Sequence, residues 1–164
     1  MNFSRESFDT NLNAAKPEYG NMLTKGINLP YMPTPDNILT YADKFVHFMG
    51  KIKSIELDYA VSSLAVVDAV LEGFYSRKES PDQNALMLFS IGCYIGEVIG
   101  RKCNGKWMNA RDCDWPERVT SMAVVMKLPS GLFIDPIAKA YRRSYYGDAE
   151  SIGVYYMELV SANS

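Results

Sequence analysis

The sequence predicts an α+β fold: a mostly helical single domain with a central buried helix and a small antiparallel sheet of about three strands. Three observations predict this class. Helical periodicity covers most of the chain, the segment around residue 93 is apolar on all sides, and short strand patterns separated by a turn signal follow it. A length of 164 residues is the usual size of one domain, so we expect residues 1–164 to share one core.

Residues 1–33 carry the weakest pattern of the chain. Apolar residues near the start allow one short amphipathic helix that ends before Pro17. Glycines and prolines then interrupt regular structure up to Pro33. We therefore expect an irregular N-terminal segment over residues 1–33 and a core over residues 34–164.

Three helix-start signals divide this core: Thr34-Pro35, Ser80-Pro81 and Asp135-Pro136. In each pair the first side chain can accept an unpaired backbone N–H, and proline tolerates the first helical position because no N–H is needed there. With the 3.6-residue periodicity, these signals predict helices over about 35–50, 59–74, 81–102, 136–146 and 149–160. We expect the second to be buried on most faces and the third to be central, because it is apolar all round.

Strand patterns lie between the third and fourth predicted helices. Residues 106–110 form a short strand candidate. Residues 120–128 alternate between the two faces of a strand, with Met122, Val124, Met126 and Leu128 on one side. Residues 129–131 (Pro-Ser-Gly) predict a turn, and residues 132–134 return as a partner strand. The expected sheet is therefore small and antiparallel.

Composition and charge disfavour several classes of function. The net charge of −2 and pI near 5.4 make a nucleic-acid partner unexpected, since binding phosphates usually needs a basic face. The longest apolar stretch, Leu86 to Gly100, is shorter than a membrane span and contains Glu97. The odd cysteine count and the lack of a signal-peptide pattern lead us to expect a cytoplasmic protein. One histidine, His47, cannot form a two-histidine zinc site, so we expect no metal and no cofactor.

Glu97 is the least expected residue of the apolar helix. A buried carboxylate is unfavourable unless it is paired, so it is either an acid or base of an active site or a structural partner, for example of Arg101 one turn later. Gly92, Gly96 and Gly100 recur at every fourth position around it. Glycine in mid-helix is typical of close packing, whereas a phosphate-binding loop would precede a helix.

The loop between the first two strand candidates is the expected contact surface for a partner. It combines acidic residues with a tryptophan next to a proline, and tryptophan is enriched at binding hot spots. A tryptophan that folds back onto the core is the competing interpretation. The residues we select for partner binding are Asp112, Asp114, Trp115 and Glu117.

Three stretches together carry a family resemblance. They are 57–59 (Leu-Asp-Tyr) with the helix after them, 91–99 (Ile-Gly-Cys-Tyr-Ile-Gly-Glu-Val-Ile) with 105–107 (Gly-Lys-Trp), and 146–152 (Tyr-Gly-Asp-Ala-Glu-Ser-Ile). The chain resembles, over roughly residues 55 to 160, a poorly characterised group of small bacterial α+β proteins, some of which are thought to be immunity proteins of secreted toxins. The matched positions are mostly apolar or glycine, so the resemblance concerns the scaffold and transfers no catalytic residue.

The resemblance implies a protein-binding inhibitor used in competition between bacteria. Its partner would be a cognate toxin or effector protein, and a mildly acidic chain would suit a basic one. Two alternatives remain open. One is a small enzyme that uses Glu97 with a nearby arginine or cysteine, and the other is a structural module that forms a homodimer or larger homo-oligomer through an edge strand near residues 106–110.

Overall fold

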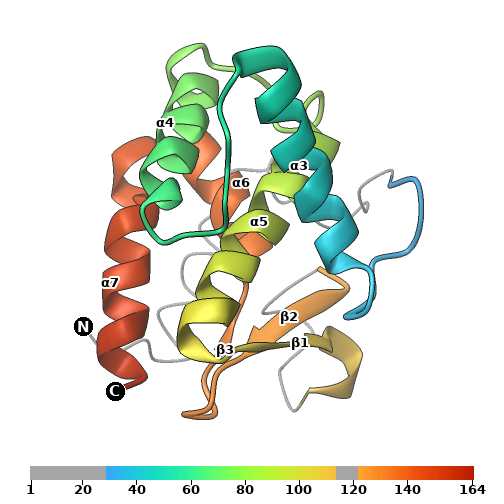
Figure 1. The fold of residues 1–164 in the computed structure, drawn as a ribbon, viewed down its shortest axis with the longest axis vertical. Coiled ribbons are helices and arrows are strands. Elements are labelled where there is room, and N and C mark those ends of the chain that lie inside the picture. The colour runs from blue at the N-terminus through green and yellow to red at the C-terminus, as the bar shows by residue number, and fades with distance from the viewer. Residues whose placement is uncertain (1–28, 114–121) are drawn as a thin grey trace.

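The computed structural model of the chain describes residues 29–113 and 122–164, and they form an α+β fold, as predicted. The helices are α3 (Ile38–Lys53), α4 (Ser63–Ser76), α5 (Ala85–Cys103), α6 (Pro136–Tyr146) and α7 (Ile152–Ala162), with short 3-10 helices η1 (Ala110–Asp112) and η3 (Gly147–Glu150). The strands are β1 (Lys106–Asn109), β2 (Val124–Lys127) and β3 (Phe133–Ile134). Figure 1 shows the sheet at the lower end of the molecule. In this view α4 and α7 lie on one side of α5, and α3 lies on the other side of it.

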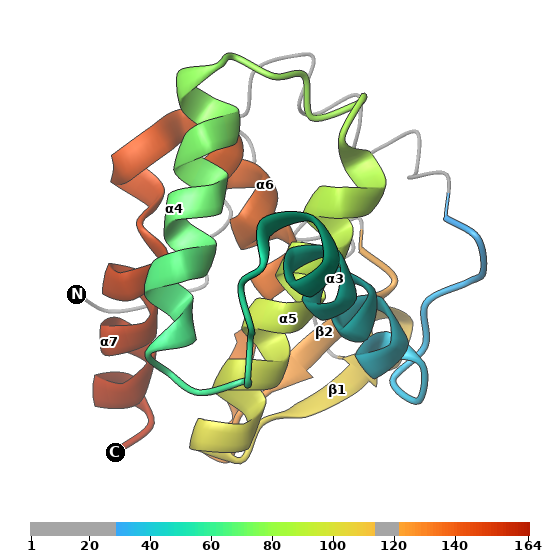
Figure 2. The same ribbon diagram turned by 45° about the horizontal axis from the view of Figure 1, so that its top comes forward.

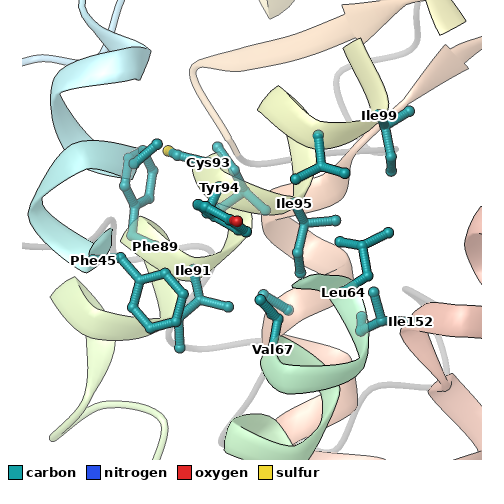
Figure 3. Close-up of a cluster of buried hydrophobic side chains, with 14 of the residues drawn as sticks. Phe45, Leu64, Val67, Phe89, Ile91, Cys93, Tyr94, Ile95, Ile99 and Ile152 are labelled. Atoms are coloured by element: carbon teal, nitrogen blue, oxygen red, sulfur yellow. The ribbon is translucent and has the colours of Figure 1, made fainter. Parts of the chain in front are cut away.

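The central helix is α5, as its apolar sequence predicts. Every residue from Leu88 to Gly96 is buried, because α3 and α6 both pack along this helix. Figure 3 shows Tyr94 and Ile95 of α5 between Phe45 of α3 and Leu64 of α4. The buried Tyr94 hydroxyl bonds to the Ser63 hydroxyl at 2.7 Å, so its polar atom is satisfied.

The glycines of α5 are positions of close approach. A Cβ atom built on Gly92 would lie 2.4 Å from the Cα atom of Ile137 in α6, and one on Gly96 would lie 2.2 Å from the Trp107 ring. Gly100 faces the end of the Met126 side chain, 2.9 Å from such a Cβ atom. The packing interpretation of these glycines is therefore confirmed.

The sheet has the order β1-β2-β3 and both pairs are antiparallel, as expected. Trp107 lies opposite Met126, and their side chains face α5, where glycines make room for them. Figure 2 shows β1 and β2 side by side, and β1 is an edge strand of this three-stranded sheet.

Two of the three helix-start predictions are wrong by several residues. Asp135 caps α6 as expected, since its carboxylate accepts the Ala138 N–H at 2.9 Å and Pro136 follows it. In contrast, residues 35–37 and 81–84 form turns, so α3 begins at Ile38 and α5 begins at Ala85. In the turn before α3, the side-chain oxygen of Asn37 accepts the Thr34 N–H at 2.8 Å. The sequence predicts the opposite arrangement, with the Thr34 side chain accepting a backbone N–H of the helix.

Other boundaries also differ from the sequence prediction. The helix α3 continues through Gly50 to Lys53 and ends at Ser54, whose φ of 53° is left-handed. The helix α4 is buried on one face only, because Ala65 and Ala69 are exposed. Residues 147–150 form η3, so the last helix begins at Ile152 rather than near residue 149. The predicted N-terminal helix lies outside the described residues.

No helix within residues 29–113 and 122–164 combines the length and the apolar character needed to cross a membrane.

Candidate functional site

Glu97 follows Gly96 on α5 and has two partners among the described residues. The indole N–H of Trp107 donates to its carboxylate at 2.9 Å, and the Nε atom of Arg101 lies 3.6 Å from its second oxygen. The side chain of Glu97 keeps 17% of its surface exposed. The predicted pairing with Arg101 is confirmed, whereas the contact from Trp107 was not foreseen.

Gly96 explains how Trp107 reaches Glu97. Two carbon atoms of the Trp107 ring would lie 2.2 and 2.5 Å from a Cβ atom on residue 96, so the glycine leaves room for the indole against α5. Its N–H then meets the carboxylate of the next residue along the helix. The Gly96–Glu97 dipeptide thus provides both the space and the acceptor for one tryptophan of β1.

Arg101 extends this contact to the loop between α3 and α4. Its guanidinium lies 3.9 Å from the centre of the Tyr59 ring, a cation–π contact, and the Tyr59 hydroxyl donates to Asp43 of α3 at 2.5 Å. Burial raises the pKa of Tyr59, and the hydrogen bond to Asp43 raises it further, so the hydroxyl stays protonated as a donor. We call Trp107, Glu97, Arg101, Tyr59 and Asp43 the α5 surface row.

The backbone fixes Tyr59 as well. It has a positive φ of 62°, which is unfavourable for a residue with a Cβ atom. Its N–H donates to the buried hydroxyl of Tyr94 at 3.0 Å, and the two rings stack with centroids 4.7 Å apart. The ring under Arg101 is therefore anchored to the core and is oriented before any partner arrives.

The predicted partner-binding residues fall mainly outside the described part of the chain. Asp114, Trp115 and Glu117 lie in the gap between residues 113 and 122. Asp112 is described: it ends η1 directly after β1, and 58% of its side chain is exposed. The side-chain amide of Asn109 donates to its carboxylate at 3.1 Å, which holds it at the end of the edge strand.

The two cysteines of α5 are poorly suited to nucleophilic chemistry. Cys93 and Cys103 are buried, and burial raises the pKa of each thiol, so the reactive thiolate is disfavoured. Across residues 29–113 and 122–164, no three His, Cys, Asp or Glu side chains are grouped so that they would hold a metal ion.

A second charged cluster lies between α4, α6 and η3 around a buried arginine. Arg143 is 1% exposed, and its Nε and Nη2 atoms lie 3.0 and 3.1 Å from the two carboxylate oxygens of Asp68. Its Nη2 atom also lies 2.8 Å from Glu72 and 3.2 Å from Asp148. Asp68 in turn accepts the Ile152 N–H at 2.8 Å, at the positive end of the α7 dipole. One buried arginine therefore joins three elements.

Lys139 and Arg142, both in α6, form ion pairs with the same carboxylate, that of Glu150 in η3. The Lys139 amine lies 2.5 Å from the Glu150 carboxylate, and the Arg142 Nε atom lies 3.3 Å from it. Burial by itself raises the pKa of Glu150, but Arg142 and Lys139 outweigh this effect and the net pKa is lowered. These contacts connect α6 to η3, the segment that leads into α7.

The charged clusters predict that acid destabilises the fold. Burial raises the pKa of Asp68, but hydrogen bonds from Arg143 and the Ile152 N–H lower it below its ordinary value. A carboxyl group with a lowered folded-state pKa stabilises the protein above its unfolded-state pKa, and this contribution is lost as the pH falls through the folded-state pKa. We expect the urea midpoint to be constant near neutral pH and to fall below about pH 4. Asp68→Asn, which cannot titrate, should reduce this pH dependence, and an unchanged profile would contradict the assignment.

The sequence-based expectations included neither the α5 surface row beyond Glu97 and Arg101 nor the Arg143 cluster. The side chains of Arg142 and Arg143 are both buried. One signal was available for the Arg143 cluster: Asp68 and Glu72 stand four residues apart on α4, so they share a helical face. No comparable pattern links Tyr59 to Arg101.

Comparisons with protein-family models, with curated proteins and with solved structures find no match to this chain.

Proposed function

We propose that this chain is a non-enzymatic, protein-binding inhibitor, most concretely an immunity protein that neutralises a cognate bacterial toxin by covering its active site. The observation that carries the proposal is the α5 surface row, which gathers a tyrosine, an arginine and a tryptophan around one carboxylate. The resemblance to small bacterial proteins that include suspected immunity proteins supports the same conclusion.

The residue types of the row favour recognition of a protein. Trp, Tyr and Arg dominate the energetic hot spots of interfaces because they combine large apolar area with directed polar groups. Here Arg101 keeps 49% of its side chain exposed while Tyr59 and Glu97 fix its position. A side chain that is already oriented loses less conformational entropy on binding.

The row and the predicted contact loop flank the same strand. Trp107 belongs to β1, and Asp112 follows that strand within one turn of 3-10 helix. A partner that contacts both would bury a surface running from α3 across α5 to η1. The proposal places the protein in the cytoplasm, where an immunity protein meets a toxin that has entered the cell.

Co-expression with the product of the neighbouring gene tests the proposal. We expect one tight, stoichiometric complex and loss of the partner's toxicity. Arg101→Ala should weaken the complex by about 2 kcal/mol, as measured by calorimetric titration, because it removes an oriented hot-spot residue. Arg77→Ala is the matched control, since this arginine is exposed at the end of α4 and pairs with Glu79 away from the row.

Equal affinities of the two arginine variants would rule out the α5 surface row as the contact surface. Trp115→Ala tests the loop separately and is expected to weaken binding by more than about 2 kcal/mol while the fold stays intact. A partner that binds but keeps its toxicity would contradict the inhibitor proposal itself.

A further inference from the structure

The outer edge of β1 carries backbone groups that none of the described strands uses. The Ala110 N–H donates to the Ala123 carbonyl at 2.9 Å, which makes these opposite residues a hydrogen-bonded pair. Because such pairs alternate along antiparallel strands, Met108 and Lys106 also bond toward β2. Trp107 and Asn109 therefore direct their backbone N–H and C=O groups away from the sheet.

Most of these outward backbone groups have no hydrogen-bond partner in the described part of the chain. Within residues 29–113 and 122–164, no hydrogen bond is made to the backbone N–H or C=O of Trp107, or to the N–H of Asn109. The carbonyl of Asn109 has one weak partner, the Cys113 thiol at 3.4 Å. An edge strand with free N–H and C=O groups is a template for pairing with another strand.

The surroundings of this edge indicate the chemistry of the incoming strand. Lys106 lies directly opposite Lys127, and both are exposed, so two like charges face each other across the pair. A carboxylate beside Lys106 would relieve this repulsion. A residue opposite Trp107 would point to the same face as the indole, toward the α5 surface row, where an apolar side chain would contact the ring.

We propose that β1 accepts an extended segment of the partner protein as a fourth, antiparallel strand, with an apolar residue opposite Trp107 and a carboxylate opposite Lys106. This inference rests on the proposed function and names the way in which the partner is held. Backbone bonds to Trp107 and Asn109 supply affinity, and the two side-chain positions supply specificity.

Asn109 allows a direct test of the backbone contact. Its φ of −64° and ψ of 129° are those that proline adopts, and the extended Met108 before it suits a proline as well. Asn109→Pro therefore removes one outward N–H without strain in the strand, because that N–H bonds to nothing within the described residues. Asn109→Ala is the matched control, since it loses the same side-chain bond to Asp112 but keeps the N–H.

A capped peptide, Thr-Thr-Val-Ile-Glu-Thr, is the first probe, and backbone amide NMR on the full chain is the readout. We expect titration with this peptide to shift the amide signals of Trp107 and Asn109. The peptide should bind about fivefold more weakly to Asn109→Pro than to Asn109→Ala. The same peptide with lysine in place of glutamate should also bind about fivefold more weakly. The proposal is overturned if the shifts are absent, lie away from β1, or are equal for both variants. Shifts at β1 that grow with protein concentration in the absence of peptide would also overturn it, because a second copy would then occupy the edge.

The same two variants separate this inference from the proposed function. If the cognate partner binds Asn109→Pro about fivefold more weakly than Asn109→Ala, strand addition is supported. If both variants bind and neutralise the partner equally, strand addition fails while the inhibitor proposal stands. If the peptide binds at β1 but no toxic partner is neutralised, the inhibitor proposal fails and the edge remains a strand-accepting site.

Discussion

Replacing Arg143 by methionine is expected to lower the free energy of unfolding by about 3 kcal/mol or more, as for other buried ion pairs that lose one partner. Methionine keeps much of the volume but removes the positive charge that faces Asp68, Glu72 and Asp148. Asp68 would then retain a partly buried negative charge whose remaining partner is the Ile152 N–H. The loss should be a stability effect, because the cluster lies away from the α5 surface row.

Urea unfolding followed by circular dichroism measures this effect. Asp148→Asn is the control from the same cluster: it also removes a charge that faces Arg143, but its side chain is 94% exposed. We expect that variant to change stability by less than about 1 kcal/mol, as exposed ion pairs do. A loss for Arg143→Met no larger than for Asp148→Asn would show that the buried arginine does not hold α4, α6 and η3 together.

Replacing Gly92 by alanine is expected to lower the free energy of unfolding by about 2 kcal/mol, although alanine is the better helix former. The added Cβ atom would lie 2.4 Å from the Cα atom of Ile137, so it would meet backbone rather than a flexible side chain. The main chains of α5 and α6 would have to separate, which would loosen the largest helix–helix contact of the core.

Gly50→Ala, also a substitution within a helix, is expected to change the free energy of unfolding in the opposite direction. Gly50 lies inside α3, and a Cβ atom there would meet nothing within 4 Å. Alanine should therefore raise the free energy of unfolding by about 0.5–1 kcal/mol, since only the helix propensity and the entropy of the unfolded chain change. Thermal unfolding of both variants checks the pair. A Gly92→Ala variant as stable as Gly50→Ala would contradict the close approach of α5 and α6.

The positions of several elements follow from local sequence, and others do not. Asp135-Pro136 predicts a capped helix start and Asp135 does cap α6, because both the cap oxygen and the proline act within one turn. Ser80-Pro81 carries the same local signal, but residues 81–84 form a turn and α5 begins at Ala85. The side-chain amide of Asn84 donates to the Ser80 carbonyl at 3.0 Å, a contact that stabilises this turn.

The α5 surface row also contains one contact that local sequence predicts and others that depend on packing. Glu97 and Arg101 are four residues apart on one helix, so helical geometry alone predicts that they pair. Tyr59 comes from a loop far from Glu97 in sequence, and Trp107 from the strand that follows α5; no helical periodicity relates either residue to α5. Their contacts depend on how α3, the following loop and β1 pack around the helix.

The amino-acid sequence by itself determined the α+β class, the central buried helix, the antiparallel sheet and the packing role of the α5 glycines. These follow from periodicity, caps and side-chain size, which act between residues that are near one another in the chain. Only the tertiary structure decided that Trp107 and Arg101 meet at Glu97, that Arg143 is buried among three carboxylates, and that no strand within residues 29–113 and 122–164 pairs with the outer edge of β1. Such contacts join different secondary-structure elements, and helical spacing shows that Asp68 and Glu72 share a face without showing which basic residue they bury.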